Sequence, residues 1–182
     1  WDRVALSRDG YLFVAPDRNR YLIEVLAPGG ELQHTIDQDA GGLERSSEQL
    51  AAVRRDLQAQ VRYDKSPPRE IRVCSTEPCV TGLWPRPNGS LWVRTSQGDH
   101  QARTVGAIVL DAYDEKGQFQ NQVLLDFPFD PAADTLHPLG PDRVLIVCGG
   151  RDAALDRKGN LIPNQSTELP TIVCYQIEED AN

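Results

Sequence analysis

The sequence predicts an all-β fold built from repeated four-stranded antiparallel sheets, the architecture of a β-propeller. Two observations predict it: a β-hairpin pattern occurs three times along the 182 residues, and a second strand–turn–strand pattern follows the first two hairpins. A single sheet of this kind cannot bury both of its faces alone, so it needs a neighbouring copy on each side. The alternative is a β-sandwich in which the hairpins resemble one another by chance.

The repeated hairpin reads "VALSRDGYLFVAP", then "GLWPRPNGSLWVRT", then "LHPLGPDRVLIVCG". When the three stretches are aligned on their turns, Leu12, Leu91 and Val144 coincide. The turns are Asp-Gly, Asn-Gly and Pro-Asp, and Gly and Asn tolerate the positive φ that a tight hairpin requires. Each stretch therefore predicts a strand, a tight turn and a second strand.

The second unit reads "YLIEVLAPGGELQHTI" and "AIVLDAYDEKGQFQNQVL", which align without a gap when Gly30 is set on Gly117. Together the two units predict complete four-stranded blades at residues 1–36 and 71–127. A third blade at 134–178 is incomplete, because a polar insert and the single strand "TIVCYQI" follow its hairpin.

We expect residues 1–182 to form a single β-propeller domain. About three blades are visible, which is fewer than the usual four to eight, so we expect the C-terminal part of a larger ring. Propellers commonly supply a missing fourth strand from the other end of the chain. The chain begins at Trp1 and contains no methionine, as expected of a processed chain or of part of a longer polypeptide.

A helical insert at residues 37–70 interrupts the β pattern. Ser46 and Gln49 have the spacing of a capping box, and a stripe at helical spacing follows them, made of Leu50, Val53, Leu57 and Val61. We therefore predict an amphipathic helix over residues 47–61. We expect its apolar stripe to pack on its own propeller, with packing on a partner as the alternative.

The stretches "SRDGYLFVAP" and "RPNGSLWVRT", each followed by "VLAPGGEL" or "DAYDEKGQF", resemble six-bladed propellers of the NHL and TolB-like type, especially the bacterial extracytoplasmic versions. The resemblance covers most of residues 2–148 and the final strand, and its matching residues are turn and core positions. It implies the propeller fold. Hydrolases and lactonases that resemble this fold build a metal site in the central channel from carboxylates and Asn or His on several blades.

Four cysteines suggest two local disulfides. Cys74 and Cys79 bracket a short turn, and Cys148 and Cys174 fall on two strands expected to be neighbours. Disulfides would place the protein outside the cytoplasm, in the periplasm or secreted. The alternative is four reduced, buried thiols in a cytoplasmic protein.

No residue is assigned a catalytic, metal-binding or cofactor-binding role. The histidines at 34, 100 and 137 lack the spacing of a zinc site, and no G-x-S-x-G, Walker or H-E-x-x-H motif occurs. Asp126, Asp130 and Asp134 could hold calcium on a loop, but the glycine and spacing of a known calcium loop are absent, which favours a solvated loop.

The net charge of −8 and the pI near 4.9 argue against nucleic-acid binding. No apolar run approaches the roughly 20 residues of a membrane span. The main hypothesis is a non-catalytic binding or scaffold module with a protein partner, an accessory subunit of an extracytoplasmic or membrane-attached assembly. The alternatives are a propeller hydrolase, lactonase or lyase with a metal in the central channel, and a small-ligand sensor.

Overall fold

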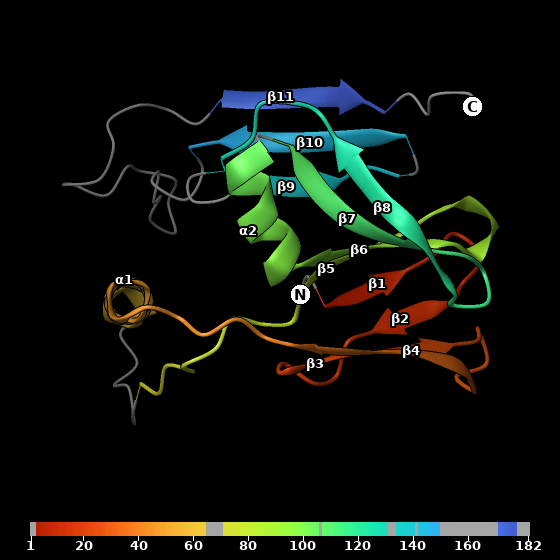
Figure 1. The fold of residues 1–182 in the computed structure, drawn as a ribbon, viewed down its shortest axis with the longest axis horizontal. Helices are drawn as coiled ribbons and strands as arrows, with labels where there is room; N and C mark the ends of the chain where they lie inside the picture. Colours follow the sequence, from red (N-terminus) through yellow and green to blue (C-terminus); the bar gives the residue numbers. More distant parts are fainter. Residues whose placement is uncertain are drawn as a thin grey trace.

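The computed structural model describes residues 3–64, 71–105, 107–130, 134–140, 142–149 and 171–177 (Figure 1). Its described part is mostly β, with three antiparallel sheets in chain order. The prediction of an all-β fold with repeated four-stranded sheets is confirmed for the first two sheets.

Sheets 1 and 2 each contain four consecutive strands in sequence order. Sheet 1 consists of β1 (Val4–Leu6), β2 (Leu12–Val14), β3 (Arg20–Leu26) and β4 (Leu32–Gly41). Sheet 2 consists of β5 (Val80–Pro85), β6 (Leu91–Thr95), β7 (Ile108–Tyr113) and β8 (Phe119–Leu125), with a 3-10 turn at Pro87–Gly89 between β5 and β6. The two glycines that align the repeat share a left-handed backbone, with φ of 92° at Gly30 and 75° at Gly117.

Sheet 3 contains three strands among the described residues, in the order β11-β10-β9. They are β9 (Thr135–Pro138), β10 (Arg143–Cys148) and β11 (Thr171–Gln176). Most of the polar insert before β11 lies outside the described residues. Within the described part of the chain, β11 therefore has β10 on one side and a free edge on the other.

The first three strands of sheet 2 are buried on both faces because sheets 1 and 3 lie on either side of sheet 2, whereas β8 is largely exposed (Figure 1). Side chains on a strand alternate between the two faces of its sheet. On β5 and β6, Leu83 and Val93 accordingly join a core cluster with Phe13 of sheet 1, whereas Trp84 and Trp92 join a second cluster with residues of sheet 3. The sheet 3 members of that cluster include Val144 and Ile146. The predicted neighbour on each side is thus present for the middle sheet.

Helix α1 (Ser47–Asp64) confirms the predicted helix, and the capping box forms as expected. The Gln49 N–H donates to Ser46 Oγ at 3.2 Å, and the Ser46 N–H donates to Gln49 Oε1 at 2.7 Å. The placement of the helix differs from the expectation. It projects away from the sheets and makes no extensive contact with a described strand (Figure 1).

The cause of this projection is that the two ends of the insert pair with each other. Glu44 forms an isolated antiparallel bridge with Thr76, and the Arg45 N–H donates to Ser75 O at 2.8 Å. The resulting two-segment stalk leads the chain away from sheet 1 before the helix begins. On α1, Leu50, Val53 and Leu57 are partly buried. The side chain of the fourth residue of the predicted stripe, at position 61, lies outside the described residues.

A second helix, α2 (Ser96–Val105), connects β6 to β7 and was not predicted. It packs against β7, and its first turn is capped by Thr95, whose Oγ1 accepts the Gly98 N–H at 2.9 Å. Among the described residues, no helix is both long and apolar enough to cross a membrane.

Candidate functional site

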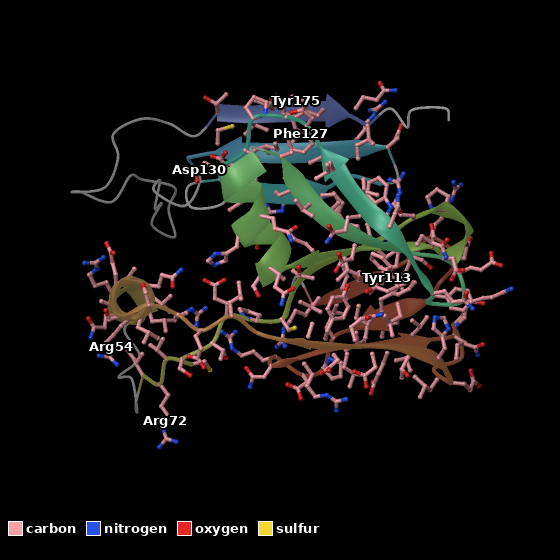
Figure 2. All side chains as sticks on the ribbon, viewed as in Figure 1. Arg54, Arg72, Tyr113, Phe127, Asp130 and Tyr175 are labelled. Atoms are coloured by element: carbon pink, nitrogen blue, oxygen red, sulfur yellow. The ribbon has the colours of Figure 1, made fainter. Side chains whose placement is uncertain are left out.

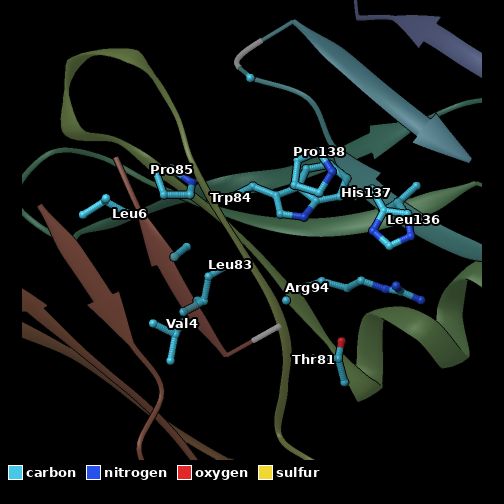
Figure 3. Close-up of a pocket in the computed structure, with 13 residues that line it drawn as sticks. Val4, Leu6, Thr81, Leu83, Trp84, Pro85, Arg94, Leu136, His137 and Pro138 are labelled. Carbon is cyan, nitrogen blue, oxygen red and sulfur yellow. The ribbon is translucent and has the colours of Figure 1, made fainter. Parts of the chain in front are cut away.

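A cavity of about 330 Å³ lies where the first strands of the three sheets approach one another (Figure 3). Most of the side chains that line it are apolar, because β1, β5 and β9 contribute mainly aliphatic, proline and tryptophan residues, but polar atoms form the larger part of its exposed surface. The lining residues are Val4, Ala5 and Leu6 from β1; Thr81, Gly82, Leu83, Trp84 and Pro85 from β5; Arg94 from β6; Leu136, His137 and Pro138 from β9; and Gly140. All three sheets therefore contribute to one site.

Arg94 is the charged residue that is held most firmly at this cavity. It shares a face of β6 with Trp92, and its side chain is only 10% exposed. Its Nε donates to Asp99 Oδ1 at 2.6 Å, and its guanidinium carbon lies 5.2 Å from the centre of the Phe129 ring. Thr81 donates its hydroxyl hydrogen to the other oxygen of Asp99 at 3.3 Å. Helix α2 thus supplies the carboxylate that fixes the guanidinium.

A second polar cluster joins sheets 1 and 2 beside a cavity of about 230 Å³. The Tyr113 hydroxyl donates to the Tyr21 hydroxyl at 2.8 Å, which in turn donates to Asp111 Oδ2 at 3.0 Å. Gln122 donates to the other oxygen of Asp111 at 3.1 Å. Figure 2 shows Tyr113 in the region between the two sheets. Both tyrosines are almost fully buried.

Burial strongly affects the acidity of this cluster. It raises the pKa of Tyr21 far above its usual range, with a further increase from the nearby Asp111 charge. Burial is also the main cause that raises the pKa of Tyr113 to about 12. The two tyrosine hydroxyls therefore remain protonated at neutral pH and, as neutral groups, tie the two sheets together.

The predicted disulfides are not formed: all four cysteines are free thiols in the structure. The strands carrying Cys148 and Cys174 do pair, but Cys174 lies opposite Leu145 and Cys148 lies opposite Thr171. This offset of three residues separates the two cysteines by roughly 10 Å along the strands and places them on opposite faces. Such a separation exceeds the span of a disulfide.

The two cysteines of the other predicted pair lie in different environments. Cys79 is buried, and its thiol donates to Ala40 O at 3.0 Å. Burial also raises the pKa of the Cys79 thiol. Cys74 is exposed on the stalk that leads to α1.

The three aspartates considered for calcium have different surroundings. Asp126 and Asp130 are exposed, whereas Asp134 is buried. The Asp134 carboxylate accepts the backbone N–H groups of Asp130 at 2.8 Å and Gly149 at 2.9 Å. Asp134 therefore has a structural role, connecting the loop before β9 to the end of β10.

The three histidines lie at separate places. His34 is on β4, His100 is on α2 with its Nε2 3.7 Å from Glu77 Oε2, and His137 lines the cavity from β9. Within the described part of the chain, no group of three or more His, Cys, Asp or Glu side chains could hold a metal ion.

Sequence reasoning did not identify Arg94, Asp99 or Trp84 as site residues. The available signal was weak: Arg94 directly follows the apolar run "LWV", and the structure shows that every residue of this strand is buried, which is unusual for an arginine. Asp99 could not be linked to Arg94 without knowledge of α2. No protein-family model, curated protein or solved structure matches the chain.

Proposed function

We propose that this chain is a non-catalytic binding module with a β-propeller frame, an accessory subunit of an extracytoplasmic or membrane-attached protein assembly. The observation that carries the proposal is the position of α1. A rigid stack of sheets holds an 18-residue amphipathic helix on a paired stalk, clear of the core (Figure 1). Recognition elements are commonly carried in this way on rigid scaffolds.

The exposed faces of the end sheets support the propeller frame. On the face of sheet 1 that points away from sheet 2, a row of leucines crosses all four strands through cross-strand pairs: Leu6, Leu12, Leu26 and Leu32. Two of them, Leu6 and Leu32, are 68% and 57% exposed. Apolar faces of this kind are the ones that a further sheet covers in a propeller.

Sheet 3 has a comparable outer face and a free edge. Leu145, Val147 and Ile172 lie on the side away from the core cluster, and Ile172 is 65% exposed. Comparison with sheets 1 and 2 predicts a fourth strand beside β11. A ring containing further blades would cover both outer faces and pair this edge.

The charge of the segment that contains and flanks α1, residues 45–72, favours an acidic partner. Residues 45–72 contain seven Lys or Arg and four Asp or Glu, a net charge of +3 in a chain whose net charge is −8. The remainder of the chain is therefore strongly acidic. Opposite charges accelerate association and orient partners. We therefore expect this segment, residues 45–72, here called the arm, to dock on an acidic protein surface.

The proposal is tested by purifying the protein from its source with its associated proteins. The arm variant carries Leu50→Ser, Val53→Ser and Leu57→Ser, and the matched control carries Ala51→Ser and Gln58→Ser at exposed positions of the same helix. We expect a stoichiometric partner with the unchanged protein and with the control, and its loss with the arm variant. Recovery of the same partner with the arm variant would exclude α1 as the docking element.

The second candidate is a propeller hydrolase, lactonase or lyase with a metal site in the central channel. The shared cavity at β1, β5 and β9 favours it, because the first strands of all three sheets contribute to one cavity, as a site built from several blades requires. Metal analysis of the purified protein discriminates between the two functions. Stoichiometric calcium or zinc would support the enzyme, whereas a metal-free protein that retains its partner would support the binding module.

A further inference from the structure

The donors at the cavity between the first strands have unused hydrogen-bonding capacity. Arg94 uses Nε to bind Asp99, and no described residue accepts a hydrogen bond from its Nη1 or Nη2 atoms. A guanidinium presents five N–H groups in a fixed fork. Four of these therefore remain for a ligand, on a side chain that contributes to the cavity wall.

The guanidinium is also preorganised. Asp99 holds Nε on one side, the Phe129 ring lies beside the guanidinium, and Thr81 holds the second oxygen of Asp99. Little side-chain entropy is therefore lost when a second acceptor binds. Because Asp99 engages only Nε, the edge formed by the two Nη atoms can bind a second carboxylate.

Trp84 provides another donor at the same cavity. It lies on the same face of sheet 2 as Arg94, since both belong to the side that faces sheet 3. No described residue accepts a hydrogen bond from its Nε1. Figure 3 shows Trp84, Arg94 and His137 around the part of the cavity between β5 and β9.

Most of the other side chains at the cavity are apolar. Leu83 and Pro85 on β5 and Leu136 and Pro138 on β9 offer no side-chain polar atoms. Apolar walls with a few convergent donors are the usual composition of a small-molecule site. A cavity of about 330 Å³ falls at the lower end of the range for such sites.

We infer that this cavity binds a small organic carboxylate with an apolar body. The carboxylate lies against the Nη edge of Arg94, with the Trp84 N–H as an additional donor, and the apolar body lies between β1, β5 and β9. The wall favours a carboxylate over inorganic phosphate, because phosphate has no apolar part to fill the remaining space. This site is separate from the docking of a protein partner on α1.

The test is a titration of the purified protein with phenylacetate, phenylacetamide and inorganic phosphate. Binding is followed by calorimetry and by the indole N–H resonance of Trp84. We expect saturable binding of phenylacetate with a shift of the Trp84 resonance. The amide has the same shape without the charge, so its affinity should be lower by about tenfold, and phosphate should bind more weakly still.

Variants separate a specific site from general apolar binding. Arg94→Lys keeps the charge but removes the fork, and we expect it to weaken phenylacetate binding by about tenfold. Should this buried position not tolerate lysine, Val4→Trp fills the cavity from an exposed position and should abolish binding. Leu124→Trp, on an exposed position of β8 outside the cavity, is the control and should bind as the unchanged protein does.

Four results would overturn the inference. The first three are equal affinity for phenylacetate and phenylacetamide, unchanged binding by Val4→Trp, and the absence of saturable binding. A phosphate affinity equal to that of phenylacetate would also overturn it, because the apolar wall would then contribute nothing.

Discussion

Replacing Tyr21 with phenylalanine should destabilise the contact between sheets 1 and 2. The Tyr21 hydroxyl accepts a hydrogen bond from Tyr113 at 2.8 Å and donates one to Asp111 at 3.0 Å. A neutral hydrogen bond contributes about 1 kcal/mol, and one to a charged group about 1.5–3 kcal/mol. Tyr21→Phe removes both bonds and leaves the buried Tyr113 hydroxyl without its acceptor. We therefore expect the free energy of unfolding to fall by about 2–4 kcal/mol. Tyr113→Phe removes only the neutral bond and should cost about 1 kcal/mol.

The same pair predicts how stability depends on pH. The pKa of Tyr113 is raised to about 12 and that of Tyr21 is raised further, whereas a tyrosine in the unfolded chain titrates near 10. Above pH 10 the unfolded chain releases protons that the folded protein retains. The contribution of the two tyrosines to the free energy of unfolding should therefore be fully present below pH 10. It should fall between pH 10 and 12, by up to about 1.4 kcal/mol per pH unit for each tyrosine. Tyr21→Phe should roughly halve this slope.

Urea unfolding followed by tryptophan fluorescence and circular dichroism measures both effects. The matched control is Tyr11→Phe, because Tyr11 is 36% exposed. It should change the free energy of unfolding by less than about 0.5 kcal/mol. If Tyr21→Phe were no more destabilising than Tyr113→Phe, or if it left the alkaline slope unchanged, the Tyr21 hydroxyl would not link the two sheets in the way described.

Three further predictions concern other parts of the molecule. Asp134→Ala should lower the free energy of unfolding by about 2–4 kcal/mol in urea unfolding, because two backbone N–H groups lose their acceptor, whereas the exposed Asp126→Ala should have little effect. Cys74 and Cys174 should react rapidly with a thiol reagent and Cys79 slowly, because burial hides its thiol and raises its pKa; equal rates in the folded protein would contradict the described burial. Ser46→Ala should reduce the local stability of α1 by about 1 kcal/mol, measured as faster amide hydrogen exchange in the helix with unchanged exchange in β7.

The repeated sheets were predictable because their turns have local causes. Gly30 and Gly117 occupy equivalent turns with positive φ, and the strands on both sides alternate in a pattern that a short window reveals. The helix at α1 was predictable for the same reason, since its capping box and apolar spacing are both local.

Features that depend on long-range pairing were not predictable. The stalk that carries α1 away from the sheets depends on the pairing of Glu44 with Thr76. The register of β10 and β11 determines whether Cys148 and Cys174 lie opposite each other. Knowing that the two strands are neighbours does not determine this register. Helix α2 was missed because "SQGDHQARTV" contains almost no apolar residues and has a glycine in its first turn.

The candidate cavity depends both on long-range contacts and on the helix that was missed. Its carboxylate partner Asp99 lies on the helix that was not predicted, and its walls come from strands more than 130 residues apart in the sequence, from β1 to β9. The position of Arg94 directly after the apolar run "LWV" was a local indication of its special environment.

The position of sheet 2 between sheets 1 and 3 is the feature on which the rest of the fold description depends. The most direct test is to measure nuclear Overhauser effects from two adjacent residues of β5. We expect Leu83 to show contacts with the Phe13 and Ile23 group of sheet 1, and Trp84 to show contacts with the Val144 and Ile146 group of sheet 3. Contacts from both residues to the same sheet, or from neither to a second sheet, would contradict it.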